Sequence, residues 1–311
     1  MHIMAIRAII TSMANKRQRR TPLDTSPLEG EVASRRQARG GRGVKSGSKT
    51  SRHPPPHPPS RGEGAGPVAI RPEDRIGALG EAAQNGFSAA LYRLMAWLSP
   101  AYPVGAFSYS GGLEWAVEAG DVGDAHALRA WLEVIIGEGG SFCDAVLLAH
   151  AHRAAATLDD ARLIAVAELA AALAPSKERH LETTAQGAAF LEVTRAAWPC
   201  AALDHLTALW PGPCAYPVAV AVAAAGHGIA VEPALAAYLQ AVAANLVSAG
   251  VRLIPLGQTD GQRVIAALEP CIRGAAARSL ATPLEQMGSA AFRADLASQR
   301  HEAQYTRLFR S

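Results

Sequence analysis

Two serines, Ser108 and Ser110, lie close together in the stretch Pro100–Glu118 and could act as nucleophiles. A serine nucleophile needs a base within hydrogen-bonding reach, and no histidine is near these serines in the sequence. They also lack the Gly-x-Ser-x-Gly context of a nucleophile elbow. Serine side chains are preferred at helix N-termini, so capping is the favoured interpretation. A small helical serine hydrolase remains an alternative.

The histidines and cysteines show no spacing that is typical of a metal site. His150 and His152 are two residues apart, so on a helix they point about 200° away from each other. Cys143 precedes His150 by seven residues, but two ligands alone make no stable site. Three further histidines are isolated, namely His180, His205 and His227. We therefore expect neither a bound metal nor a cofactor in this chain, with a metal-storing protein as an alternative.

Charged residues point more clearly to binding than to catalysis. Lys177 is the only lysine after residue 86, and it stands beside Glu178 and Arg179 at the start of an expected helix. A cation in the first turn of a helix opposes the helix dipole, so helix stability does not explain its position. The cluster is either a solvated group of surface charges or a docking patch for a partner.

The end of the chain combines arginines with aromatic side chains. Such side chains are the usual anchors of protein interfaces. The segment 283–311 has no apolar stripe of its own, so we expect it to be mobile and to become ordered on binding. A frayed basic end is the alternative. The residues concerned are Arg300, His301, Tyr305, Arg307, Phe309 and Arg310.

The stretch that carries the two serines predicts a helix, a corner and a second helix. Pro100, Pro103 and Gly105 must end the apolar helix that precedes them. Ser108 or Ser110 would then cap the next helix, with Glu114 in or near its first turn. Phe107 and Tyr109 stand at the corner, where we expect both rings to be at least partly buried in the core or in a dimer interface.

From Phe87 onward the apolar residues recur at helical spacing, and no convincing alternating strand is present. Helix starts are expected at Asp124, at Asp159 or Asp160, and at Ser176. Glycines interrupt the pattern over 137–140, and an irregular link is expected over 253–257. The sequence therefore predicts one all-α, alanine-rich domain of roughly eight to ten helices over residues 87–311.

Composition separates this domain from the residues before it. The chain has a formal net charge of +3, but residues 1–86 hold 15 Lys and Arg against 7 Asp and Glu, which leaves 15 against 20 for 87–311. The acidic body argues against nucleic-acid binding. The four cysteines form no close pair, as expected for a reduced cytoplasmic protein. Neither a signal peptide nor a membrane span is expected.

Residues 1–86 contain 9 Pro and 11 Gly, and they also carry clusters of basic residues. A segment of this composition buries too little apolar surface to offset its ordering entropy, so it is predicted to be a disordered extension. A start codon assigned too far upstream would account for it. The alternative is an arm that binds nucleic acid or membrane.

Four stretches, in order along the chain, resemble the UreF family of urease accessory proteins. They are Pro100–Glu118, Leu173–Arg179, Val251–Gln258 and Arg300–Ser311. The resemblance implies a cytoplasmic, non-enzymatic adaptor that forms homodimers and serves nickel insertion into apo-urease. The implied partners are UreD (also called UreH), the GTPase UreG, whose GTP hydrolysis it would regulate, and apo-urease. With nickel as its metal, the storage alternative becomes a nickel-storing metalloprotein.

The resemblance and the charge pattern together define the expected partner-binding residues. No catalytic residue and no metal ligand is among them. They are Phe107, Tyr109, Glu114, Lys177, Glu178, Arg179, Arg252, Gln258, Arg300, His301, Tyr305, Arg307, Phe309 and Arg310.

Overall fold

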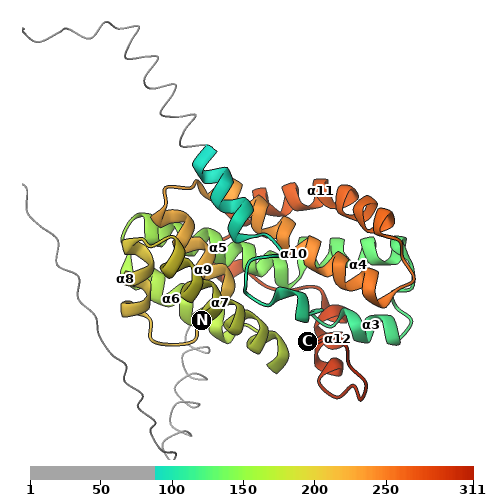
Figure 1. The fold of residues 1–311 in the computed structure, drawn as a ribbon. Helices are drawn as coiled ribbons and strands as arrows, with labels where there is room; N and C mark the ends of the chain where they lie inside the picture. The colour runs from blue at the N-terminus through green and yellow to red at the C-terminus, as the bar shows by residue number, and fades with distance from the viewer. Residues whose placement is uncertain (1–87) are drawn as a thin grey trace, which may run out of the picture. The chain divides into compact units, whose positions relative to one another are not determined.

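The computed structural model describes residues 88–311, which belong to the second of the two units into which the chain divides, Pro67–Ser311. The extension predicted for residues 1–86 lies outside the described residues. Residues 88–97 are helical, and residues 98–311 form ten further α-helices and two 3-10 helices. No strand occurs within 88–311. The prediction of an all-α fold is confirmed (Figure 1).

The elements follow one another with short connections. In chain order they are η1 (Ala106–Ser108), α3 (Leu113–Glu118), α4 (Ala125–Glu138), α5 (Gly140–Ala156), α6 (Asp160–Ala172), α7 (Lys177–Ala197), α8 (Ala201–Leu209), α9 (Tyr216–Gly226), α10 (Val231–Leu253), α11 (Gln258–Ala281), η2 (Leu284–Gln286) and α12 (Phe292–His301).

Three predicted helix starts are confirmed by their capping hydrogen bonds. Asp124 accepts from the amide of the third residue after it at 2.8 Å, and so begins α4. Asp159 does the same for α6 at 3.0 Å, and Ser176 for α7 at 3.1 Å. Each side chain satisfies a first-turn amide that has no partner within its helix.

The corner before α3 differs in part from the prediction: the Ser110 hydroxyl does accept from the first-turn amide of Glu114, at 3.4 Å, but neither serine occupies the N-cap position. Gly112 holds that position with φ 85° and makes no side-chain cap. A side chain here would be strained in this left-handed conformation and would also collide with α12, whose Ser298 amide nitrogen would be 2.5 Å from an added Cβ. Glycine therefore lets α12 rest directly on the start of α3, and the two helices lie side by side in Figure 1.

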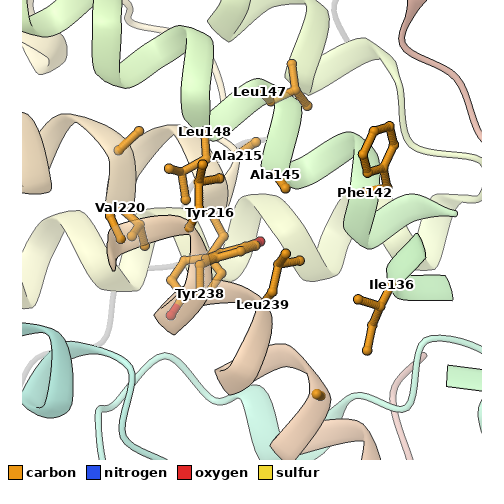
Figure 2. Close-up of a cluster of buried hydrophobic side chains, with 14 of the residues drawn as sticks. Ile136, Phe142, Ala145, Leu147, Leu148, Ala215, Tyr216, Val220, Tyr238 and Leu239 are labelled. Atoms are coloured by element: carbon orange, nitrogen blue, oxygen red, sulfur yellow. The ribbon is translucent and has the colours of Figure 1, made fainter. Parts of the chain in front are cut away.

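The centre of the domain is built from small apolar side chains. Helix α9 is buried over Tyr216–Ala224, and it packs closely against α5. Alanine and valine on both helices allow the two backbones to approach each other. Figure 2 shows this region, with Leu148 of α5 and Val220 of α9 lying beside Tyr238 of α10.

An aromatic cluster connects the beginning of the described chain to this centre. The ring of Phe190, on α7, is fully buried. Its centre lies 6.1 Å from the ring centre of Trp97 and 5.7 Å from that of Tyr216, both in edge-to-face contacts. Tyr102 shares a hydrogen bond of 2.8 Å with Thr194, also on α7. The cluster holds the segment before α3 against α7 and so fixes where α3 begins.

Helix α10 is long and apolar enough to cross a membrane by length and composition, and half of that apolar window is buried inside the domain. Leu235, Tyr238 and Leu239 face the interior. This burial is what a core helix shows, and within residues 88–311 no other helix passes the same test.

A glycine in α7 gives a prediction that separates packing from helix propensity. A Cβ at Gly187 would lie 2.1 Å from the carbonyl oxygen of Cys214, so Gly187→Ala must displace the chain before α9. We expect a loss of about 2–4 kcal/mol in the free energy of unfolding, measured by urea denaturation. The matched control is Gly274→Ala in α11, where an added Cβ meets nothing within 4 Å. This variant should be more stable by about 0.5–1 kcal/mol, and equal effects of the two substitutions would contradict the packing described here.

Candidate functional site

The end of the chain is packed against the body of the domain. Helix α12 lies on α3, and the ten residues after it, 302–311, cross α3, α7 and the corner; we call residues 302–311 the C-terminal strap. The structure thus shows one docked arrangement of this end of the chain, and the expected mobility of 283–311 in the free protein stays a prediction. The segment indeed lacks an apolar stripe, but it is held mainly by hydrogen bonds to buried carboxylates that are far away in sequence.

Glu114, in the first turn of α3, is the central contact of the strap. One carboxylate oxygen accepts from the Leu308 amide at 2.6 Å, and the other accepts from the Phe309 amide at 2.9 Å. The second oxygen also lies 3.0 Å from Nε2 of His301. Because Glu114 is only 7% exposed, these contacts replace the water that its carboxylate would otherwise bind.

His301, the last residue of α12, connects α3 with α7. Its ring is completely buried, with Nδ1 2.6 Å from the carboxylate of Glu178 and Nε2 facing Glu114. Each ring nitrogen therefore lies within hydrogen-bonding distance of a different carboxylate, so the ring bridges α3 and α7. The other oxygen of Glu178 accepts from Arg307 of the strap at 2.6 Å.

The last two residues of the chain pair with the corner through the backbone. The Arg310 amide donates to the carbonyl oxygen of Ser108, and the Ser110 amide donates to an oxygen of the terminal carboxylate of Ser311, both at 2.8 Å. The Ser110 hydroxyl donates to the same carboxylate oxygen, and the Ser311 hydroxyl donates to Glu182 at 2.8 Å. The corner and the strap therefore determine each other's conformation.

Phe309 is the one aromatic side chain of the strap that enters the body, with 4% of its surface exposed. The guanidinium of Arg252 lies 4.4 Å from the centre of its ring, a cation–π contact. Arg252 also donates to the carbonyl oxygen of Phe107 at 3.0 Å. Asn245 of α10 donates to the Tyr109 carbonyl oxygen at 3.3 Å.

The two corner aromatics have opposite environments. Tyr109 is 3% exposed, as predicted, but Phe107 is 67% exposed, so its burial in the core is wrong, whereas its burial in a dimer interface stays a prediction. The left-handed Gly105, with φ 73°, starts the 3-10 turn that carries Phe107 on the outer side. A substitution of Phe107 should therefore not carry the stability cost of a core cavity.

The structure brings together about half of the predicted binding residues. Seven of them belong to the strap or lie in the region against which it packs: Tyr109, Glu114, Glu178, Arg252, His301, Arg307 and Phe309. Lys177, Arg300, Tyr305 and Arg310 are exposed on the outer side of the same region. Gln258 is exposed at the start of α11 and makes no hydrogen bond to the strap among residues 88–311.

Arg179 does not form a surface patch with Lys177 and points into the domain. Its guanidinium lies 2.6 Å from Glu182 and 4.0 Å from Asp144 of α5. Tyr238 donates to the Asp144 carboxylate at 3.2 Å. These charged groups line a cavity of about 460 Å³, together with Gln186 and Asn245.

Sequence reasoning missed Asp144 as part of this cluster. The available signal was a single acidic residue inside the apolar run Phe142–Ala149, but nothing in the sequence identified its partners. Burial raises the pKa of Asp144 to about 6, and Arg179 and the Tyr238 hydrogen bond only partly oppose this.

The serines and histidines considered for chemistry have structural contacts. The Ser108 hydroxyl donates to the carbonyl oxygen of Gly105 at 2.8 Å, and neither Ser108 nor Ser110 contacts a histidine within residues 88–311. His150 bonds Thr282 and Arg162, whereas His152 bonds Ile229. In the described part of the chain, no three His, Cys, Asp or Glu side chains are grouped so that they could hold a metal ion.

The buried carboxyl of Asp144 predicts a pH dependence of stability. The fold favours the protonated form of Asp144, so this carboxyl adds to the free energy of unfolding at low pH. The added stability is complete below pH 3.8 and is lost as the pH rises through about 6. A fifth of the Asp144 side chain is exposed, so we expect wild type to lose about 1–3 kcal/mol relative to Asp144→Asn between about pH 4 and about pH 7. Urea denaturation of both proteins measures this difference. A constant difference across that range would show that Asp144 titrates normally.

The role of Glu114 predicts a second, local effect. Glu114→Gln replaces one acceptor oxygen by a donor, so amide hydrogen exchange in residues 302–311 should become at least about tenfold faster while the helical circular dichroism is unchanged. Glu118→Gln is the matched control, because Glu118 is exposed and accepts only from Gln304 of the strap. Glu118→Gln should accelerate exchange in residues 302–311 clearly less than Glu114→Gln does. Equal exchange rates in the two variants would contradict the conclusion that Glu114 is the central contact of the strap.

Comparison with known proteins extends the similarity well beyond the strap and the corner. The UreF family model matches residues 122–269. Urease accessory protein UreF of Rhodopseudomonas palustris strain BisB18 is 61% identical over 224 residues, which is 72% of this chain and 93% of that protein. The corresponding protein of Bradyrhizobium sp. strain ORS 278 is 59% identical over 235 residues, 76% of this chain and 98% of that protein. With such identity over nearly the whole length of these relatives, the chain belongs to the UreF family of urease accessory proteins.

Proposed function

We propose that this chain is a non-enzymatic adaptor for the maturation of nickel-dependent urease. It would act in the cytoplasm as a homodimer, bind UreD (UreH), and bring the GTPase UreG and apo-urease into one assembly. Nickel would be handled by that assembly without a stable site in this chain, and the adaptor would regulate GTP hydrolysis by UreG. Membership of the UreF family supports the urease connection, and the surface of the strap supports the adaptor role.

The observation that carries the proposal is the outer side of the docked strap. Tyr305 is fully exposed and Leu308 is 64% exposed, so neither contributes to the domain core. Arg300 and Arg310 are exposed beside them, and Lys177 lies next to Glu302, which accepts from its amide at 2.7 Å. We call Lys177, Arg300, Tyr305, Leu308 and Arg310 the strap face.

The strap face fits a partner surface that is acidic and has a pocket for an aromatic ring. Aromatic and arginine side chains dominate the binding energy of many interfaces. The rest of the body carries more acidic than basic residues. A local basic surface on such a domain favours one complementary acidic partner over non-specific binding to any negatively charged molecule. We assign this partner as UreD.

The two other functions have less support. A hydrolase needs a nucleophile and a base in contact, whereas Ser108 and Ser110 donate to main-chain oxygens of the corner and the strap. Turnover by the purified chain that depends on either serine would favour the hydrolase. A nickel-storing protein needs a group of ligands, and nickel retained after purification in nickel-containing medium would favour it.

A second copy of the chain would have to cover a different surface. Residues 88–97 expose Leu91, Tyr92 and Met95, with 48%, 69% and 67% of their surface accessible, and Phe107 is also exposed. Exposed apolar side chains of this kind support the proposed homodimer.

The adaptor role predicts a defined loss of binding. The double variant Tyr305→Ala/Arg310→Ala should reduce co-purification with UreD at least about tenfold, because it removes one aromatic and one arginine anchor. The remaining binding should be less sensitive to salt than that of wild type, since one exposed charge is missing. Melting temperature should be unchanged, as neither side chain is buried.

The matched control for this experiment is Arg273→Ala. Arg273 is a comparably exposed arginine on α11, and it should bind UreD like wild type when replaced. Undiminished binding by the double variant would exclude the strap face as the docking surface, and the exposed side chains of residues 88–97 would be tested next.

A further inference from the structure

We propose that Glu302 is a positioning residue for the binding of UreD and that it acts through Lys177. Glu302 fixes the first turn of α7 through a contact with the main chain, and the ammonium group of Lys177 then stands free on the strap face to pair with a carboxylate of the partner. This role rests on the docking function proposed above for the strap face. It is assigned to a residue that does not itself belong to that face.

The start of α7 is fixed by the end of α12. The hydroxyls of Ser176 and Ser298 share a hydrogen bond of 2.7 Å, and both side chains are buried. The side-chain amide of Gln299 donates to the carbonyl oxygen of Pro175 at 3.1 Å. The two residues that precede α7 are therefore held by residues 122 and 124 positions further along the chain.

Glu302 completes this contact at the first residue of α7. One of its carboxylate oxygens accepts from the Lys177 amide at 2.7 Å, and Ser176 accepts from the Arg179 amide at 3.1 Å. Two first-turn amides that have no partner inside the helix are thereby satisfied. The carboxylate also offsets the positive end of the helix dipole, which disfavours a cation at this place. Glu302 therefore accounts for a lysine position that helix stability alone does not explain.

The ammonium group of Lys177 makes no ion pair with any of residues 88–311, although acidic side chains are close to it. The carboxylate of Glu178 is paired with Arg307. Glu302 binds the amide of Lys177 and forms no ion pair with its ammonium group. Since Lys177 is exposed, its charge is available to a carboxylate on another molecule.

The sign of the change in affinity separates positioning from a simple surface charge. If Glu302 acted only through its negative charge, removing it would strengthen the attraction to an acidic partner. If Glu302 holds the first turn of α7, its removal lets Lys177 move, and the binding of the same partner becomes weaker. The two roles therefore predict opposite changes in affinity.

A double-mutant cycle with the full chain and purified UreD measures these changes. Lys177→Ala should weaken binding at least about fivefold, and Glu302→Ala should weaken it at least about threefold. In the background of Lys177→Ala, adding Glu302→Ala should change the affinity less than about 1.5-fold, because the side chain that Glu302 positions is absent.

Two further variants complete the series. Glu302→Gln keeps an acceptor oxygen for the Lys177 amide and loses the charge, so it should bind UreD at least as tightly as wild type. Glu285→Ala removes an exposed acidic side chain of η2 and is the matched control, which should not weaken binding.

Hydrogen exchange distinguishes this local effect from loss of the strap. Glu302→Ala should accelerate exchange of the Lys177 amide, whereas the amides of Leu308 and Phe309 should stay protected, because Glu114 holds them. If those strap amides also lose protection, Glu302 supports the strap as a whole, and its assignment to Lys177 is wrong.

The same series separates this role of Glu302 from the docking function itself. If Lys177→Ala and Tyr305→Ala/Arg310→Ala both bind UreD like wild type, the strap face is not the docking surface, and both proposals are wrong. If the Tyr305/Arg310 variant loses binding, two results overturn only the role of Glu302. One is a Glu302→Ala chain that binds at least as tightly as wild type, and the other is an equal loss of affinity in the presence and absence of Lys177.

Discussion

The carboxylate of Glu114 is the contact on which the functional end of this molecule depends. It is buried, so its charge must be met by donors of the protein. Those donors are two backbone amides of the strap and the ring of His301, which come from a part of the chain almost 200 residues away. Helix α3 and the C-terminal strap are therefore interdependent, since each satisfies polar groups that the other would leave unpaired.

The alanine-rich centre provides the rigid support for this arrangement. Close packing of α5 on α9 positions α7 and α10, and these helices carry Glu178, Glu182 and Arg252 to the strap. The aromatic cluster around Phe190 then fixes the segment that leads into the corner. Small side chains in the core thus have a functional consequence, because they set the spacing between the carboxylates that hold the strap.

The proposed adaptor role agrees with this architecture. Several polar groups of the described chain are used in internal contacts: the corner serines bond main-chain oxygens, and His152, His227 and His301 bond carbonyl oxygens or carboxylates. What remains on the outside of the strap is aromatic and basic. A surface of that kind is suited to binding, and it is presented in a defined conformation because the inner side of the strap is held by the hydrogen bonds to Glu114 and by the buried ring of Phe309.

Much of the local structure was determined by the sequence alone. Asp124, Asp159 and Ser176 begin helices because a short polar side chain before an apolar helical pattern satisfies first-turn amides, and this requires only neighbouring residues. The all-α class follows from the same periodicity. The acidic body and the arginine-rich end were likewise visible in the residue types.

Only the tertiary structure decided how distant residues meet. Residues 302–311 have no apolar stripe, so no local pattern could show that Glu114, Glu178 and Glu182 supply acceptors for them. The exposure of Phe107 depends on the left-handed conformation of Gly105. The N-terminus of α3 depends on Gly112, where a side chain would collide with α12. Asp144 acquires its raised pKa from burial among helices far apart in the chain. Local hydrogen bonding is encoded within a few residues, whereas burial and charge pairing depend on which surfaces the fold brings together.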